Sequence, residues 1–162
     1  ISKKVGSNIS HVKNMVIWGN HSPTMYPDIE NVMIDGKPGS SVIQDMDWVE
    51  NSFLPTVQQR GKSVIDARGA SSATSAAKAA LDTIIACENT TEDGDCFSAA
   101  VASDGAYGVP EGLICGYPLI TLADGSVEIK RDIVLSDFAK EKFQLSIDEL
   151  SSEREAVQHL MK

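Results

Sequence analysis

Residues 15–22, MVIWGNHS, contain the strongest candidate for chemistry in this sequence, the imidazole of His21. Three apolar residues and a tryptophan give way at once to Gly, Asn, His and Ser, a pattern typical of a buried strand that ends in a loop. At such a strand end, an imidazole can take a proton from a hydroxyl group or give one to a carbonyl oxygen near neutral pH. The alternative is a loop histidine that is hydrogen-bonded to nearby backbone, and spacing alone leaves both open.

Two further candidates, Ser71 and Ser72, precede a predicted helix over residues 73–87. That helix is rich in alanine and serine, so its surface would be smooth. A ligand or another backbone could approach it closely, or the helix could instead pack tightly inside the same domain. A serine hydroxyl at a helix N-terminus could contact a carboxylate, because free amides and the helix dipole favour an anion there. It could equally be a plain N-cap of the helix.

The composition is that of a globular domain. The 162 residues are 42% hydrophobic and 23% charged, which suits one domain with a sizeable core. A net charge of −9 argues against binding to nucleic acid or to anionic membranes. Binding of a dicarboxylate would need local Lys or Arg. No apolar run approaches the roughly 18–20 residues of a membrane-spanning helix, and no signal peptide opens the chain.

No metal site is predicted. The three cysteines, Cys87, Cys96 and Cys115, lack Cys-x-x-Cys spacing, and the three histidines are scattered, whereas a structural zinc site needs four clustered ligands. The acidic turn at residues 89–95, NTTEDGD, lacks the ligand pattern of a calcium-binding EF-hand. Reduced thiols in an intracellular protein are therefore expected, with an acidic metal-binding module as an alternative reading.

Local patterns predict an α+β fold, a twisted antiparallel sheet with helices packed on it. A short hairpin is expected over residues 32–38, where Asp35 and Gly36 supply a tight turn. Strands are expected over residues 97–102, 113–122 and 126–129, and helices over residues 45–54, 55–68 and 73–87. A break is expected at Pro55, which suits the first turn of the second helix, and Gly69 is expected to end that helix as a left-handed cap. The residues of the second helix at 57, 61, 64 and 65 predict its buried face.

From Ser136 onward the chain is predicted to be helical and charged. Ser146 and Glu149 form a capping-box pattern, which predicts a helix start there. An inward-facing apolar stripe is expected at Ile147, Leu150, Val157, Leu160 and Met161.

The sequence resembles malate dehydrogenases, in particular the cytosolic and chloroplast-like branch of the lactate/malate dehydrogenase family. The resemblance covers essentially the whole chain in order, and it is most specific at the histidine segment and around Ser71. One departure is Ala106 in the loop at 103–108, where cytosolic relatives usually carry Asn at this position or its neighbour. The matching segments are 18–22 (WGNHS), 26–28 (YPD), 57–61 (VQQRG), 71–79 (SSATSAAKA), 103–110 (SDGAYGVP) and 137–142 (DFAKEK).

The resemblance implies an activity and roles for the candidates. The reaction would be the reversible oxidation of (S)-malate to oxaloacetate, with NAD, or alternatively NADP, as cofactor. His21 would be the catalytic proton acceptor and donor, and Ser71 and then Ser72 would border the substrate. The complete enzyme would be a homodimer, with the helix at 73–87 contributing to the subunit interface.

Family members carry an N-terminal Rossmann domain before the matching segment. No Gly-x-Gly-x-x-Gly follows a strand-like run here, so no cofactor-binding residue is assigned. We therefore expect residues 1–162 to be the C-terminal substrate-binding and catalytic domain of a two-domain enzyme, inactive when isolated. The Rossmann domain that mainly binds NAD would be absent from this chain. A cytoplasmic location is expected, unless a targeting segment lies upstream.

Two alternatives stay open for the function. The first is lactate dehydrogenase or another 2-hydroxyacid dehydrogenase, although the histidine segment of lactate dehydrogenases typically reads GEHG. The second is a catalytically inactive folding or dimerisation module formed by the isolated chain.

Overall fold

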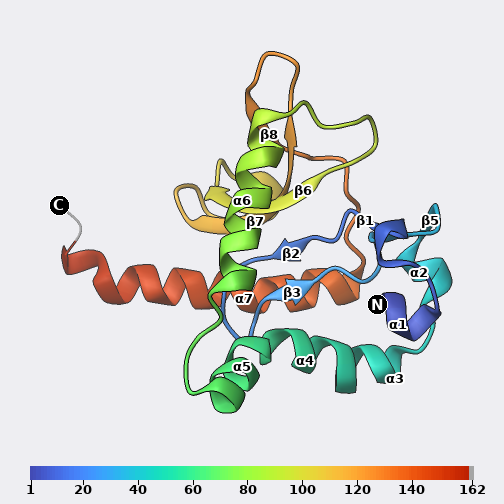
Figure 1. Ribbon diagram of the computed structural model, residues 1–162. Coiled ribbons are helices and arrows are strands. Elements are labelled where there is room, and N and C mark those ends of the chain that lie inside the picture. The colour runs from blue at the N-terminus through green and yellow to red at the C-terminus, as the bar shows by residue number, and fades with distance from the viewer. Residues whose placement is uncertain (161–162) are drawn as a thin grey trace.

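The computed structural model describes residues 1–160 and confirms the predicted α+β fold (Figure 1). Three small antiparallel sheets carry helices packed around them. The α-helices are α1 (Ser2–Val5), α2 (Gly39–Val42), α3 (Met46–Trp48), α4 (Leu54–Gln58), α5 (Arg60–Arg68), α6 (Thr74–Glu88) and α7 (Asp137–Val157). The strands are β1 (Val12–Lys13), β2 (Ile17–Trp18), β3 (Tyr26–Pro27), β4 (Met33–Ile34), β5 (Lys37–Pro38), β6 (Phe97–Ala102), β7 (Ile114–Thr121) and β8 (Val127–Ile129). Shorter 3-10 segments occur at η1 (Ile9–His11), η3 (Ala106–Gly108) and η4 (Gln158–Leu160).

The largest sheet is an antiparallel meander in the order β6-β7-β8. Leu119 in β7 pairs with Phe97 of β6 and with Ile129 of β8. The central strand is covered on both faces, since every residue from Cys115 to Leu119 is buried. All three predicted strands are confirmed to within one residue at each end.

A short ribbon of β2 and β3 lies against this sheet (Figure 1). Just beyond β2, Gly19 and Gly116 exchange backbone hydrogen bonds of 3.2 and 2.6 Å, which tie the ribbon to β7. A Cβ on Gly116 would lie 2.6 Å from the carbonyl oxygen of Ile17, so only glycine allows this close crossing. The ribbon therefore enters the hydrophobic core, where Trp18 and Tyr26 are at most 1% exposed.

The predicted hairpin at 32–38 is confirmed as β4 and β5. Asp35 and Gly36 connect the strands with φ angles of 50° and 77°. Two consecutive positive φ angles match the right-handed twist of the flanking strands.

Residues 46–68 form one nearly continuous helical run rather than two helices separated at Pro55. Asp45 caps its start, with its Oδ1 accepting the Trp48 N–H at 3.0 Å. A π-helical segment, Val49–Phe53, then leads into α4, and Pro55 falls in the first turn of α4. Proline is tolerated there, and the π segment takes the place of the predicted break.

The predicted buried face of α5 is wrong. The helix has no buried residue, and Ile65 is 47% exposed. Helical spacing identifies which residues share a face, but it does not say that the same chain covers that face. The predicted end of this helix is confirmed, because Gly69 adopts a left-handed φ of 70° and its N–H bonds the Ile65 carbonyl at 2.7 Å.

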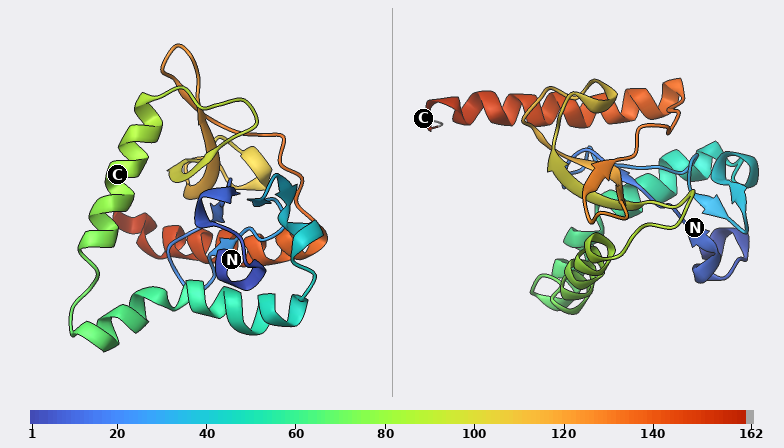
Figure 2. Two further views of the ribbon diagram at one scale, coloured as in Figure 1. Left: turned by 45° about the vertical axis from the view of Figure 1, so that its right-hand side comes forward. Right: turned by 90° about the horizontal axis from the view of Figure 1, so that it is seen from above.

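Helix α6 runs along the outside of the molecule beside the main sheet (Figure 1, Figure 2). None of its residues is buried, and Leu81, Ile84 and Ile85 are each at least half exposed. Its smooth surface is therefore not used for tight packing within residues 1–160.

Helix α7 is a single 21-residue helix whose C-terminal end extends past the rest of the molecule (Figure 2). Its N-cap is Ser136, whose Oγ accepts the Ala139 N–H at 3.1 Å. The capping-box prediction at 146–149 is therefore wrong, since both residues lie inside the helix. Phe143 and Ile147 are buried, but Val157 and Leu160 are 45% and 69% exposed, so the inward stripe ends early. Met161 lies outside the described residues.

Within residues 1–160, the helices are too short or too polar to cross a membrane.

Candidate active site

The candidate site begins at the buried end of β2. The Trp18 indole N–H donates to Asp28 Oδ2 at 3.0 Å, and its ring packs edge-on against Tyr107 with centroids 4.8 Å apart. Phe143 of α7 lies on the same indole, 5.1 Å between centroids. Because these groups are packed around Trp18, the backbone at the end of β2 is held rigidly.

Gly19 turns the chain out of this core toward α7. Its φ is +92°, and a Cβ at this position would lie 2.0 Å from Ser146 Oγ. A side chain would therefore be strained in conformation and would overlap the helix. Glycine lets the backbone pass close enough for the Asn20 N–H to donate to Ser146 Oγ at 2.9 Å.

The loop at residues 20–24 is held by Glu149 of α7. Glu149 Oε2 accepts hydrogen bonds from Asn20 Nδ2 at 2.9 Å, from Ser22 Oγ at 2.6 Å and from Thr24 Oγ1. The hydrogen bonds from Ser22, Thr24 and Asn20, in that order, hold the pKa of Glu149 below its usual range. The carboxylate is therefore charged near neutral pH, and its hydrogen bonds are charge-assisted and correspondingly strong.

His21 lies within this loop and is exposed. Asn20, Ser22 and Thr24 are half-buried, whereas His21 and Pro23 between them are exposed. Within the described chain the one imidazole with a hydrogen bond is that of His11, whose Nδ1 is 2.7 Å from Asp35 Oδ1. The His21 ring thus has no bond to nearby backbone, in contrast to the alternative interpretation, and both its nitrogens can face a ligand.

Ser71 and Ser72 lie in the connection between α5 and α6. Ser71 is exposed and Ser72 is half-buried. The alternative that one of them caps the helix is wrong, because the N-cap of α6 is Ala73 and no side chain bonds the free amides there. Since neither hydroxyl makes a hydrogen bond to another residue within 1–160, both are available to a ligand. No hydrogen bond in this part of the chain joins them to the His21 loop.

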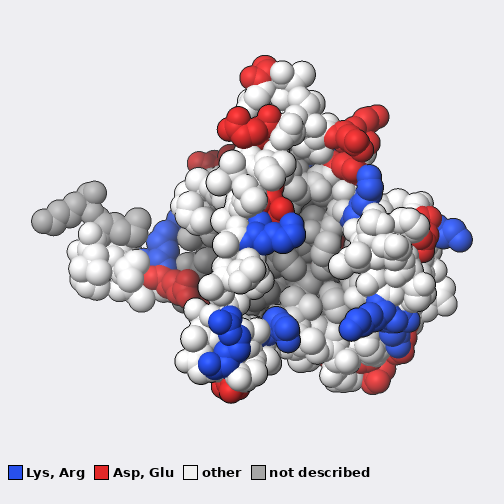
Figure 3. Space-filling view, in the orientation of Figure 1, with Lys and Arg blue, Asp and Glu red and all other residues white. Residues whose placement is uncertain are grey.

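The segment that contains these serines is rich in basic residues. Residues 60–78 contain Arg60, Lys62, Arg68 and Lys78 against one acid, Asp66, which gives this segment a charge of +3 in a chain of −9. On the face shown in Figure 3, the loops at the top carry mainly acidic groups, whereas the lower part carries most of the basic groups together with some acidic ones. Lys62 and Lys78 are paired with acids one helical turn away. The arginines in this segment can therefore supply the local positive charge that a dicarboxylate requires.

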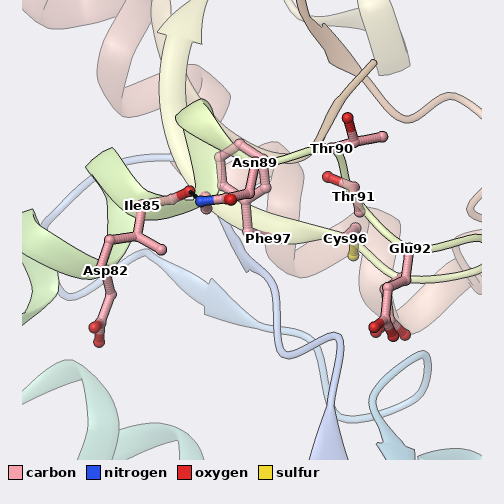
Figure 4. Close-up of a pocket in the computed structure, with 10 residues that line it drawn as sticks. Asp82, Ile85, Asn89, Thr90, Thr91, Glu92, Cys96 and Phe97 are labelled. Carbon is pink, nitrogen blue, oxygen red and sulfur yellow. Dashed lines mark hydrogen bonds between the residues drawn. The ribbon is translucent and has the colours of Figure 1, made fainter. Parts of the chain in front are cut away.

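Two cavities of the described chain contain none of these candidates. One, of about 400 Å³, lies between the end of α6 and the turn at 89–95 (Figure 4). There the Asn89 amide donates to the Ile85 carbonyl at 2.7 Å. Burial raises the pKa of the neighbouring Cys96 to about 11, so its thiol is protonated and unreactive near neutral pH.

The other cavity, of about 580 Å³, also contains Cys96 in its wall, together with two lysines. Lys13 is paired with Asp95 at 3.0 Å and Lys130 with Asp132 at 3.1 Å, so both cations are already neutralised. Within residues 1–160, no three His, Cys, Asp or Glu side chains are grouped so that they could hold a metal ion.

Sequence reasoning missed two residues of the site, Ser146 and Glu149. Their S-x-x-E spacing was interpreted as a helix start, whereas in the structure they contact a loop more than 120 residues earlier in the chain. The signal that could have corrected this is Ser136, which caps the same helix ten residues upstream.

Comparison with known proteins identifies the family of the chain. Residues 1–161 match the family described as lactate/malate dehydrogenase, alpha/beta C-terminal domain. A malate dehydrogenase of Magnetococcus marinus is 50% identical over 161 residues, covering 99% of this chain and 49% of the relative.

Solved structures give the same result. The crystal structure of malate dehydrogenase from Naegleria fowleri has a TM-score of 0.88 at 37% identity, covering 99% of this chain and 49% of that one. A lactate dehydrogenase of Trichomonas vaginalis, in complex with NADH and oxamate, has a TM-score of 0.86 at 26% identity, covering 98% and 50%. The chain therefore spans about half the length of these relatives.

Proposed function

Because this chain belongs to the lactate/malate dehydrogenase family, as its alpha/beta C-terminal domain, we propose that it is the substrate-binding and catalytic half of a malate dehydrogenase. The activity of the longer enzyme would be the reversible oxidation of (S)-malate to oxaloacetate. The observation that carries the proposal is the exposed imidazole of His21, presented on a loop whose flanking side chains are all anchored to α7.

His21 has the chemistry that this reaction needs. In the oxidative direction its neutral imidazole accepts the hydroxyl proton of malate, and in the reverse direction the imidazolium donates a proton to the carbonyl oxygen of oxaloacetate. The dinucleotide, NAD or alternatively NADP, supplies the hydride acceptor when it is bound. Ser71, with Ser72 next to it, would donate hydrogen bonds to a substrate carboxylate, within the basic segment at 60–78.

The described residues do not fit the phosphates of a dinucleotide. Of the helices with at least eight residues, only α7 follows a strand, and residues 130–136 before it contain no glycine. A phosphate cradle needs a glycine-rich turn at that place. We therefore propose that the cofactor is held mainly by a Rossmann domain of the complete enzyme.

Substrate class can be tested with the complete enzyme that contains this chain. Initial rates with oxaloacetate and with pyruvate, each measured with NADH and with NADPH, should give a higher kcat/KM for oxaloacetate. A preference for pyruvate would instead support the lactate dehydrogenase alternative. No reduction of either substrate would refute the proposed function.

We also propose that the complete enzyme is a homodimer in which α6 lies at the interface. Leu81, Ile84 and Ile85 are 50–59% exposed on this helix, and apolar side chains gathered on one helix are typical of a covered surface. Leu81→Lys should shift the sedimentation of the enzyme toward the monomer. Leu145→Lys, at a leucine of similar exposure on α7, serves as the matched control. Equal sedimentation of the two variants would contradict this role of α6.

The isolated chain gives a separate test of the remaining alternative. If it sediments as a dimer and has no activity, it is a dimerisation module by itself.

A cytoplasmic location is proposed from the three free cysteines, which suit a reducing compartment. Cell fractionation, followed by detection of this chain in the soluble or an organellar fraction, tests it.

A further inference from the structure

We propose that Glu149 is a positioning residue for His21, and that α7 acts through it to hold the catalytic loop in its working conformation. This inference rests on the proposed function and deepens it, because it assigns a role in the reaction to a helix that carries no reacting group.

The first support is the geometry of the contact. A single carboxylate oxygen, Oε2 of Glu149, accepts three hydrogen bonds from the side chains of Asn20, Ser22 and Thr24. These residues alternate with His21 and Pro23 along the loop. The three bonded side chains are half-buried, whereas His21 and Pro23 between them are exposed. Because both chain neighbours of His21 are bonded to Glu149, the backbone that carries the imidazole is held in place.

The second support is a further tie from the same face of the helix. Ser146 lies three residues before Glu149, a spacing that places both side chains on one face. Its Oγ accepts the Asn20 N–H at 2.9 Å, so the backbone next to His21 is held as well. Ser22 Oγ also accepts the Thr24 N–H at 3.1 Å, which closes the loop on itself. The loop thus has several restraints, and Glu149 is the only charged one among the described residues.

The third support is that Glu149 is not part of the core. The apolar residues that α7 buries in the core are Ala139, Phe143 and Ile147, which are 0%, 2% and 5% exposed. Glu149 is only half-buried and follows Ile147 by two residues. Its loss should therefore disturb the loop far more than the fold. Since a displacement of about 1 Å at a catalytic group can cost about 100-fold in rate, the expected effect is on turnover.

The test uses the complete enzyme with three substitutions. Glu149→Ala removes the acceptor, Glu149→Gln keeps an acceptor oxygen without the charge, and Glu153→Ala is the control at an exposed glutamate on the same helix. Glu149→Ala should lower kcat/KM for oxaloacetate by about 10- to 100-fold. Its NADH affinity should stay close to that of Glu153→Ala, and its Tm should be only slightly lower. Glu149→Gln should recover a large part of the rate.

Hydrogen exchange gives a readout that does not depend on activity. Amides at residues 20–25 of the complete enzyme should exchange faster in Glu149→Ala than in Glu153→Ala, while amides of β7 should be unchanged. Equal rates and equal exchange in these two variants would overturn the inference. A loss of rate that merely follows a loss of Tm, without rescue by glutamine, would also overturn it. A wild-type enzyme that is inactive on oxaloacetate and pyruvate would refute the proposed function instead, and the exchange experiment would still decide whether Glu149 holds the loop.

Discussion

Replacing Gly19 by alanine should destabilise the protein through two separable effects. The φ of +92° puts a side chain in the left-handed region, which costs about 1–2 kcal/mol for a residue other than glycine. The new Cβ would also lie 2.0 Å from Ser146 Oγ and 2.5 Å from Ser146 Cβ. Rotating the serine hydroxyl away cannot relieve the second overlap, so β2 and α7 must separate slightly. Overpacking of this kind costs about 1–3 kcal/mol, and the total loss should be roughly 2–5 kcal/mol.

A second glycine separates the two effects. Gly125 has a similar φ of +85°, but a Cβ added there would meet no other atom within 4 Å. Gly125→Ala should therefore show only the conformational cost of about 1–2 kcal/mol. Urea titrations of wild type, Gly19→Ala and Gly125→Ala, followed by tryptophan fluorescence, measure the free energy of unfolding of each. The difference between the two variants is the cost of the overlap with Ser146.

Activity gives the second half of this test. Because Gly19 directly precedes the loop of His21, Gly19→Ala should also lower the turnover of the complete enzyme, whereas Gly125→Ala should not. If Gly19→Ala were no less stable than Gly125→Ala and equally active, the close approach of β2 to α7 would not matter and the reasoning would be refuted.

Two further predictions concern Glu149 and Ser71. Hydrogen bonds from Ser22, and then from Thr24 and Asn20, lower the pKa of Glu149 in the folded protein. Its charged form therefore stabilises the fold fully above the unfolded-state pKa of about 4.3. This stabilisation is lost as the pH falls through the lower pKa of the folded state. The Tm of wild type should therefore fall more steeply below about pH 4.3 than that of Glu149→Gln. Scanning calorimetry between about pH 3 and about pH 6 would cover both this fall and the baseline above it. Parallel curves for the two proteins would contradict the prediction. Ser71→Ala should raise the KM for oxaloacetate about 2- to 10-fold, the value of one hydrogen bond, with Tm unchanged, and an unchanged KM in steady-state assays would exclude the contact.

Local signals in the sequence were enough to predict much of the fold. The Asp35-Gly36 turn and the Gly69 helix end were predicted correctly because each depends on the backbone preference of one or two residues. The strands of the main sheet were predicted from apolar runs between turn residues, which also depend on nearby sequence alone. The exposure of His21 followed in the same way from the change in composition after Trp18.

The features that were missed depend on contacts that local sequence does not encode. Ser146 and Glu149 have the spacing of a capping box, and only the folded chain shows that they face residues 20–24 instead. The apolar residues of α5 have helical spacing, yet none of them is buried within the described chain, and the apolar side chains of α6 were not predicted. The apolar residues near the C-terminal end of α7 are exposed for the same reason. Their spacing shows that they share a face of the helix, but not whether other elements cover that end of it.

The measurement that tests the account most directly is a comparison of wild type with His21→Asn in the complete enzyme. Oxaloacetate-dependent oxidation of NADH gives turnover, and quenching or enhancement of NADH fluorescence gives cofactor affinity. Because asparagine cannot exchange the proton, kcat should fall by about 100- to 10,000-fold while NADH affinity stays unchanged. Turnover close to that of wild type would contradict the assignment of His21 as the proton acceptor and donor.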